Sequence, residues 1–408
     1  MKKSLILVLC ALLFLASCAP NTGREEVVQD EESEEETAII PTYQLSETKY
    51  RTLLPYKPSQ ARGIIVDQIA NRLDISEMEE GLMRHSMEYY DPDEYFFQEG
   101  QYLDSDTVYR WLERKLPEDE IERQVEERLK RLEEEGYTIN EEVEQREREE
   151  IGSGLNPVLE NEESEEGHRN NPRYLSHILE QNYLVQNDED SIQLAGISIA
   201  LALKSVYRFQ TEVGGPYYYE DISYNEMLEQ GQQIAQIVVE RMRSMEGLAD
   251  IPIMVALYQE EEQSSPIPGN YVAKTYVEGG ETEIDSWESI DEEYILFPSE
   301  EGEEKYVDDH ETVMSFGNEV AKYFPNYVGI VGRGFYVGDQ MRQLSIEIPI
   351  EFFGEGEIIG FSQYIYGLVQ EIFPNYYDLE IQVTTNNELQ SLIYREAGED
   401  EPTVRIIN

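Results

Sequence analysis

The stretch Phe324-Pro325-Asn326-Tyr327 recurs 49 residues later as Phe373-Pro374-Asn375-Tyr376, and the patterns around the two copies are alike. A proline followed by Asn-Tyr is typical of a helix that ends and a strand that begins. An amphipathic helix pattern precedes each copy, over Thr312–Tyr323 and Phe361–Ile372. Two strand patterns follow each copy, over Val328–Val337 with Leu344–Phe352 and over Asp378–Thr384 with Leu389–Tyr394. The sequence therefore predicts a repeated helix–strand–strand unit.

A more divergent copy of this unit, without the Phe-Pro-Asn-Tyr link, covers Tyr224–Val277. Such repeats predict an α+β fold in which antiparallel hairpins form sheets and the helices pack on one face. A smaller, mostly helical region is expected N-terminal to these units. The alternative is that one tetrapeptide recurs by coincidence, in which case the two stretches need not be equivalent.

Changes in composition divide the chain into six segments. We expect a signal peptide at 1–17, a disordered acidic tether at 18–49, an N-terminal globular region at 50–116, an acidic helical or disordered connector at 117–171, an α+β domain at 172–397 and a C-terminal tail at 398–408.

The N-terminus has the pattern of an export signal. Lys2 and Lys3 form a positive start, and Leu5–Ser17 is a largely apolar run of 13 residues. A helix of this length spans only about 20 Å, too short for a hydrocarbon core of roughly 30 Å. The segment is therefore interpreted as a cleaved signal peptide.

The end of this run, Leu15-Ala16-Ser17-Cys18, fits the lipobox of bacterial prolipoproteins. A thiol at Cys18 can accept diacylglycerol, and the small residues before it give a signal peptidase access to the bond between Ser17 and Cys18. We expect prolipoprotein diacylglyceryl transferase and lipoprotein signal peptidase as maturation partners. The acyl chains, palmitate among them, would anchor the mature chain to the extracellular face of the cell membrane. The alternative is an ordinary secretory signal with an incidental cysteine.

The charge of the chain excludes one class of partner. With 86 acidic and 31 basic residues, the net charge is −55. Such a chain repels phosphate backbones, so nucleic-acid binding is not expected. The two cysteines, Cys10 and Cys18, lie at the N-terminus, which leaves no downstream thiol for a disulfide, a zinc site or a nucleophile.

No motif predicts catalysis, a cofactor or a metal. The chain has four histidines and no Gly-x-Ser-x-Gly elbow, and no carboxylate pair can be singled out among so many acids. The run Asp308-Asp309-His310-Glu311 carries cation-binding groups, but acids at a helix start have a simpler cause in the helix dipole. We therefore expect a protein that is not an enzyme.

Four stretches resemble the CamS family, the sex-pheromone-precursor lipoproteins of Gram-positive bacteria. They are Gly81–Ser86, Tyr95–Gln101, Ile178–Gln181 and Gly196–Leu203. The resemblance implies that the liberated signal peptide is trimmed to a hydrophobic heptapeptide pheromone, which here is residues 11–17. Ala11, Leu15, Ala16 and Ser17 match the family's pheromone, whereas positions 12–14 differ.

The resemblance leaves the role of the mature body open. We expect a binding role, with a peptide or a cell-wall component as ligand. The alternatives are the solute-binding lipoprotein of a transporter, which needs alternating strand–helix units in two lobes, and a cell-wall hydrolase, which needs a close carboxylate pair in a cleft.

Overall fold

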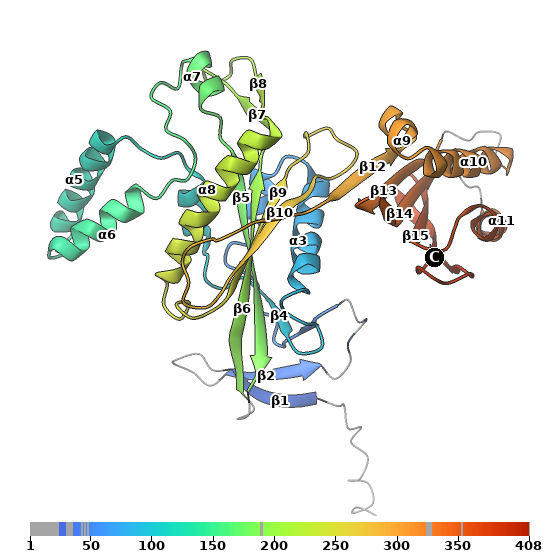
Figure 1. Ribbon diagram of the computed structural model, residues 1–408, viewed down its shortest axis with the longest axis horizontal. Helices are drawn as coiled ribbons and strands as arrows, with labels where there is room; N and C mark the ends of the chain where they lie inside the picture. The colour runs from blue at the N-terminus through green and yellow to red at the C-terminus, as the bar shows by residue number, and fades with distance from the viewer. Residues whose placement is uncertain are drawn as a thin grey trace, which may run out of the picture.

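A computed structural model describes residues 24–29, 36–41, 44, 46, 49–187, 191–323, 329–351 and 354–407. It has two lobes, each built on one sheet (Figure 1). We call the described residues up to 291 the first lobe and residues 292–407 the second lobe. Signal peptide, lipobox and heptapeptide, residues 1–18, lie outside the described residues.

The first lobe is built on a nine-stranded mixed sheet. Its main strand order is β11-β10-β9-β6-β5-β4-β3, and β1 pairs with both β2 and β6. The strands are β1 (Arg24–Gln29), β2 (Glu36–Pro41), β3 (Arg51–Thr52), β4 (Phe96–Glu99), β5 (Leu175–Gln186), β6 (Ser191–Leu203), β9 (Ile253–Gln259), β10 (Asn270–Val277) and β11 (Glu288–Ser289). The central strands β6 and β9 carry long apolar runs because both of their faces are buried.

Helices cover both faces of this sheet. The α8 helix (Tyr224–Arg243) packs on one face, and α3 (Arg72–Ser86) packs on the other (Figure 1). The sheet has a hydrophobic core on each face, one against α8 and one against α3, which we call the α8 core and the α3 core. Successive residues of β6 point to opposite faces, so Ile199 belongs to the α8 core and Ala200 to the α3 core. The remaining helices of the sheet region are α2 (Ile64–Gln68), α4 (Ser105–Leu112) and α7 (Glu165–Asn170), and a small hairpin is formed by β7 (Val206–Phe209) and β8 (Tyr218–Asp221).

The acidic connector is helical. It forms a hairpin of α5 (Glu118–Glu134) and α6 (Glu141–Ile151), which projects from the side of the first lobe (Figure 1). Val125 is the buried residue of α5. The buried residue of α6 is Glu147, which pairs with Arg128 of α5 at 3.2 Å, and Arg148 of α6 pairs with Glu118 of α5, so ion pairs as well as Val125 hold the two helices together.

The second lobe is built on a six-stranded sheet in the order β12-β13-β14-β15-β16-β17. Two helices, α10 and α11, pack on one face of it, and Phe316 and Phe361 are completely buried there. The elements are β12 (Glu292–Phe297), α9 (Glu300–Lys305), α10 (Val307–Tyr323), β13 (Val331–Val337), β14 (Gln340–Pro349), α11 (Glu355–Ile372), β15 (Asp378–Thr385), β16 (Glu388–Arg395) and β17 (Thr403–Ile406).

The α+β class is confirmed, but two details of the predicted architecture are wrong. The sheets are mixed, because β14–β15 and β6–β9 are parallel pairs. A hairpin that leads through a helix into the next hairpin must make a crossover, and a crossover joins parallel strands. The expectation of helices on one face holds for the second lobe only.

The element order of the second lobe is helix–strand–strand twice over, α10-β13-β14 and α11-β15-β16. Pro374 follows directly on the C-cap of α11, Phe373. The matching Phe324–Tyr327 lies outside the described residues, so the equivalence of the two units stays a prediction.

Three terminal and flanking segments differ from expectation. Residues 24–29 and 36–41 form the hairpin β1–β2 within the expected tether, since their β-branched residues favour strands. The N-terminal region contributes β3 and β4 to the large sheet, so it does not stand apart from it. The expected C-terminal tail contains β17, which pairs with β16. No helix among the described residues is long and apolar enough to cross a membrane.

Candidate functional site

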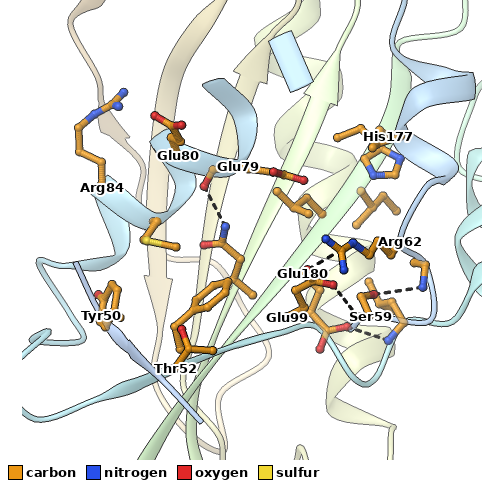
Figure 2. Close-up of a pocket in the computed structure, with 18 of the residues that line it drawn as sticks. Tyr50, Thr52, Ser59, Arg62, Glu79, Glu80, Arg84, Glu99, His177 and Glu180 are labelled. Carbon is orange, nitrogen blue, oxygen red and sulfur yellow. Dashed lines mark hydrogen bonds and ion pairs between the residues drawn. The ribbon is translucent and has the colours of Figure 1, made fainter. Parts of the chain in front are cut away.

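A cavity of about 740 Å³ lies beside α3, lined mainly by the first lobe and by Gln343 of the second, within the range of about 300–1,000 Å³ that is typical of ligand sites. Its walls come from α3, from β4 and β5, and from the chain between β3 and α2 (Figure 2). The aliphatic and phenylalanine residues of the lining are Ala61, Ile65, Met83, Met87, Phe97, Leu103, Ile178 and Leu179. Several polar and charged side chains share the same cavity, as a specific ligand site requires.

His177 is the most unusual of these polar groups. Its side chain is 2% exposed, and its Nδ1 has no hydrogen-bond partner among the described residues. Burial lowers its pKa to about 4, so the ring is neutral at neutral pH. A neutral imidazole has one donor and one acceptor nitrogen, and leaving either unpaired in a protein interior costs free energy.

A β-bulge places His177 in the cavity wall. Between Leu175 and His177 the register of β5 against β6 shifts, which makes Ser176 the extra residue. Leu175 packs in the α8 core, whereas His177, two residues on, lines the cavity. Bulges often re-aim a side chain next to a functional site in this way.

The lower wall of the cavity is a hydrogen-bonded cluster around Glu99 (Figure 2). The hydroxyl of Tyr56 donates to one carboxylate oxygen, and the Ser59 N–H donates to the other at 2.6 Å. Burial and this hydrogen bond to Glu99 raise the pKa of Tyr56 to about 12. The guanidinium of Arg62 lies 3.6 Å from Glu99 Oε1, beyond hydrogen-bond distance. The cluster fixes the chain between β3 and α2 against the end of β4.

Two further carboxylates of the cavity, those of Glu180 and Glu79, differ in the hydrogen bonds that they receive from the protein. Glu180 accepts the backbone N–H groups of Gln101, Tyr102 and Leu103, at 3.0, 3.2 and 2.7 Å, so it holds the turn after β4 in place. Glu79, on α3, receives no hydrogen bond at its carboxylate from the described residues. Burial and the charge of Glu99 raise the pKa of Glu79, against the opposing effect of Arg62.

The candidate residues predicted from the sequence that the structure describes do not line this cavity. The lipobox residues Leu15, Ala16, Ser17 and Cys18 are outside the described part of the chain. In the Asp308–Glu311 run, Asp309 accepts from the hydroxyl of Tyr336 at 2.8 Å, which gives it a structural role. The described residues contain no group of three or more His, Cys, Asp or Glu able to hold a metal ion.

Sequence reasoning missed the cavity, although it had a signal for it. Three of the four stretches that carry the family resemblance, Gly81–Ser86, Tyr95–Gln101 and Ile178–Gln181, contribute lining residues. They lie on α3, β4 and β5, far apart in the chain, and only the fold brings them together.

The comparisons with known proteins agree on one family. The sequence profile described as "CamS sex pheromone cAM373 precursor" matches residues 56–401. A sex pheromone precursor from Lactobacillus salivarius subsp. salivarius UCC118 has a similar structure, with a TM-score of 0.78 and 25% identity over 91% of this chain and 99% of that one. The C-terminal domain of the sex pheromone staph-cAM373 precursor from Staphylococcus aureus gives a TM-score of 0.68 and 27% identity, over 84% of this chain and 99% of that one. Among curated proteins there is no match.

Proposed function

Since this chain belongs to the CamS family of sex-pheromone precursors, we propose that it is a lipid-anchored surface protein with two products. The first is a hydrophobic heptapeptide, residues 11–17, trimmed from the cleaved signal peptide. The second is the mature body, which binds a small ligand in the cavity between α3 and β5.

The anchoring part of the proposal is supported by the sequence at the cleavage site. Leu15, Ala16 and Ser17 precede Cys18 directly after a short apolar run. Two acyl chains on Cys18 would hold the protein stably on the extracellular face of the membrane, because each buried methylene contributes about 0.8 kcal/mol. The transferase and the signal peptidase would act on the chain only during maturation.

The binding role rests on one observation, the buried Nδ1 of His177, which has no hydrogen-bond partner among the described residues, in the wall of a cavity of about 740 Å³. Buried polar atoms of folded proteins are nearly always hydrogen-bonded, so an exception calls for an explanation. A ligand that bonds to the ring would supply one.

Two other functions are less well supported. A transporter's solute-binding lipoprotein would carry successive parallel strand–helix units. In the second sheet, by contrast, the strands lie in chain order and all neighbours are antiparallel except β14 and β15. A cell-wall hydrolase would need a free acid and base. Glu79 and Glu99 do face one cavity, but Glu99 is held by Tyr56 and Ser59.

Two experiments test the proposal. In a Gram-positive host grown with an alkyne-tagged palmitate analogue, the parent chain should be labelled and Cys18→Ser should not, and mass spectrometry of the medium should detect the peptide of residues 11–17. Labelling of Cys18→Ser would refute the anchor.

For the body, native mass spectrometry of the mature chain purified from that host should show a bound small molecule. The variant His177→Leu, which lacks the ring nitrogens, should lose it. An identical bound mass in both proteins would argue against the cavity as the site.

A further inference from the structure

From the chemistry of its walls we infer that the cavity binds a short peptide with apolar side chains and free termini. The inference rests on the proposed binding role and specifies the ligand class. Three features of the cavity carry it: an adaptable apolar wall, a pair of opposite charges, and a strand edge.

The apolar wall suits aliphatic side chains of varied shape. Met83, Met87, Phe97 and Leu179 are only partly buried although they pack against the α3 core. Their remaining exposed surface lies where a ligand can cover it, and burial of such surface is favourable by about 25 cal/mol per Å². Two methionines in one wall add flexibility, because their unbranched side chains repack around different partners.

Opposite charges reach into the cavity from opposite walls. Figure 2 shows Glu79 extending from α3 and Arg62 from the segment before α2. Glu79 is exposed, and its carboxylate receives no hydrogen bond from the described residues, so it is open to an ammonium group. The guanidinium of Arg62 lies 3.6 Å from Glu99 and 5.9 Å from the ring centroid of Tyr56, and its side chain is 62% exposed, so its planar donors can still hold a carboxylate. A zwitterion satisfies both charges, whereas a ligand with one charge satisfies only one.

The edge of β5 distinguishes a peptide from a free amino acid. The pairing of β4 with β5 ends where Glu99 lies opposite Gln181, and Gly100 then donates to the Glu180 carbonyl at 3.1 Å. Beyond this point His177, Ile178 and Leu179 line the cavity, and among the described strands only β6 runs beside them. An extended peptide binds such an edge through its main chain, and its side chains then point into the flanking pockets. The ring of His177 lies at the end of this edge, where it can bond to a peptide group.

The test uses trileucine as probe and isothermal titration calorimetry as readout. The protein is the complete mature chain, residues 18–408, with Cys18→Ser to omit the lipid. Trileucine should bind with a dissociation constant below 1 mM. N-acetyl-trileucine amide, which has neither terminal charge, should bind at least tenfold more weakly, and so should free leucine, which has no peptide group.

Two variants assign the termini. Glu79→Gln should weaken trileucine at least tenfold but leave its desamino analogue unaffected, and Arg62→Ala should weaken trileucine but not trileucine amide. Glu126→Gln on α5, remote from the cavity, is the matched control and should bind like the parent. Equal thermal stability of the variants would show that the fold is intact.

The outcomes separate this inference from the proposed function. If trileucine does not bind, or binds no better than leucine or the blocked peptide, the peptide inference is wrong. The binding role would survive that result if another small molecule occupied the purified protein and was lost in His177→Leu. If trileucine does not bind and the purified protein carries no small molecule that His177→Leu loses, both the peptide inference and the proposed binding role are wrong.

Discussion

Arg84 donates to both carboxylate oxygens of Glu292, from Nε at 3.3 Å and from Nη2 at 3.0 Å, and so joins α3 of the first lobe to β12 of the second. Nη2 also donates to Glu77 at 2.7 Å, and the guanidinium lies 4.6 Å from the ring centroid of Phe335. Nε2 of His85 lies 3.2 Å from Glu292 Oε2, the oxygen that also accepts from Arg84 Nη2. One arginine therefore neutralises two buried acids at the place where the chain passes from one sheet to the other.

The first prediction is that Arg84→Met destabilises the protein. Glu292 and Glu77 are 7% exposed each, and without Arg84 their charges lose their main partner. Removal of one member of a buried ion pair costs about 3–5 kcal/mol. Because a third of the Arg84 side chain is exposed, we expect about 2–3 kcal/mol. Urea unfolding measures this value.

Arg123→Met is the control for this variant. Arg123 makes an exposed pair with Glu120 at 2.5 Å on α5, and its loss should leave the urea midpoint within error. Equal midpoints for Arg84→Met and the parent would show that the contact between the lobes does not stabilise the fold.

The second prediction concerns the recurring motif. Phe373 is 4% exposed, and its ring lies 5.0 Å from that of Phe316 on α10, so it fixes the end of α11 to its neighbouring helix. Phe373→Ala should lower the free energy of unfolding by about 3–5 kcal/mol, because it leaves a cavity in the core. Tyr376→Ala, in the same motif but with a side chain that is 57% exposed, should cost no more than about 0.5 kcal/mol. Similar losses in both variants would contradict this account.

Much of the fold was predictable because it depends on local signals. Apolar periodicity located α8 and α11. The pairing of strands was not predictable in the same way. Parallel contacts such as β6 with β9 join residues 56 positions apart, for example Ile197 with Ile253. They depend on how a helix crosses the sheet, which no local pattern encodes.

The candidate site was beyond the sequence for a related reason. His177 occurs in an ordinary strand pattern, and its unusual state depends on a bulge at Ser176 and on burial by other elements. Glu79 and Glu99 are two of 86 acids, and nothing in their neighbours distinguishes them. By contrast, the expected role of Cys18 is readable from its neighbours, because the peptidase that would act there recognises a contiguous segment.

The third prediction is a pH dependence that arises from Asp74. This buried carboxylate accepts the Tyr258 hydroxyl at 2.9 Å and the Gly269 N–H at 2.6 Å, and burial raises its pKa to about 7. The folded state therefore holds the Asp74 proton more tightly than the unfolded chain, where the pKa is near 3.8. Its contribution to stability is complete below about pH 4 and is lost as the pH rises to 7.

Asp74→Asn removes this titration. Relative to the parent, the variant should gain stability as the pH rises from 4 to 7, by an amount on the order of a few kcal/mol. Thermal unfolding at pH 4, 5.5 and 7 measures the difference. Asp67→Asn, at an exposed position of α2, should follow the parent at every pH. A constant offset between Asp74→Asn and the parent would show that Asp74 does not titrate in this range.

The last prediction is that His177→Leu makes the empty protein more stable. The substitution removes a buried nitrogen that has no partner in the described structure, and such an atom costs about 1–3 kcal/mol. It also changes the pH profile. The pKa of His177 is about 4 in the folded protein and about 6.5 in the unfolded chain, so the parent loses this group's contribution as the pH falls from 6.5 to 4. The gain from His177→Leu should therefore grow over that interval. Urea unfolding of ligand-free protein at pH 7.5 and 4.5 tests both statements. If His177→Leu is instead less stable at pH 7.5, the ring makes a structural contact, and the case for a ligand at this cavity loses its main support.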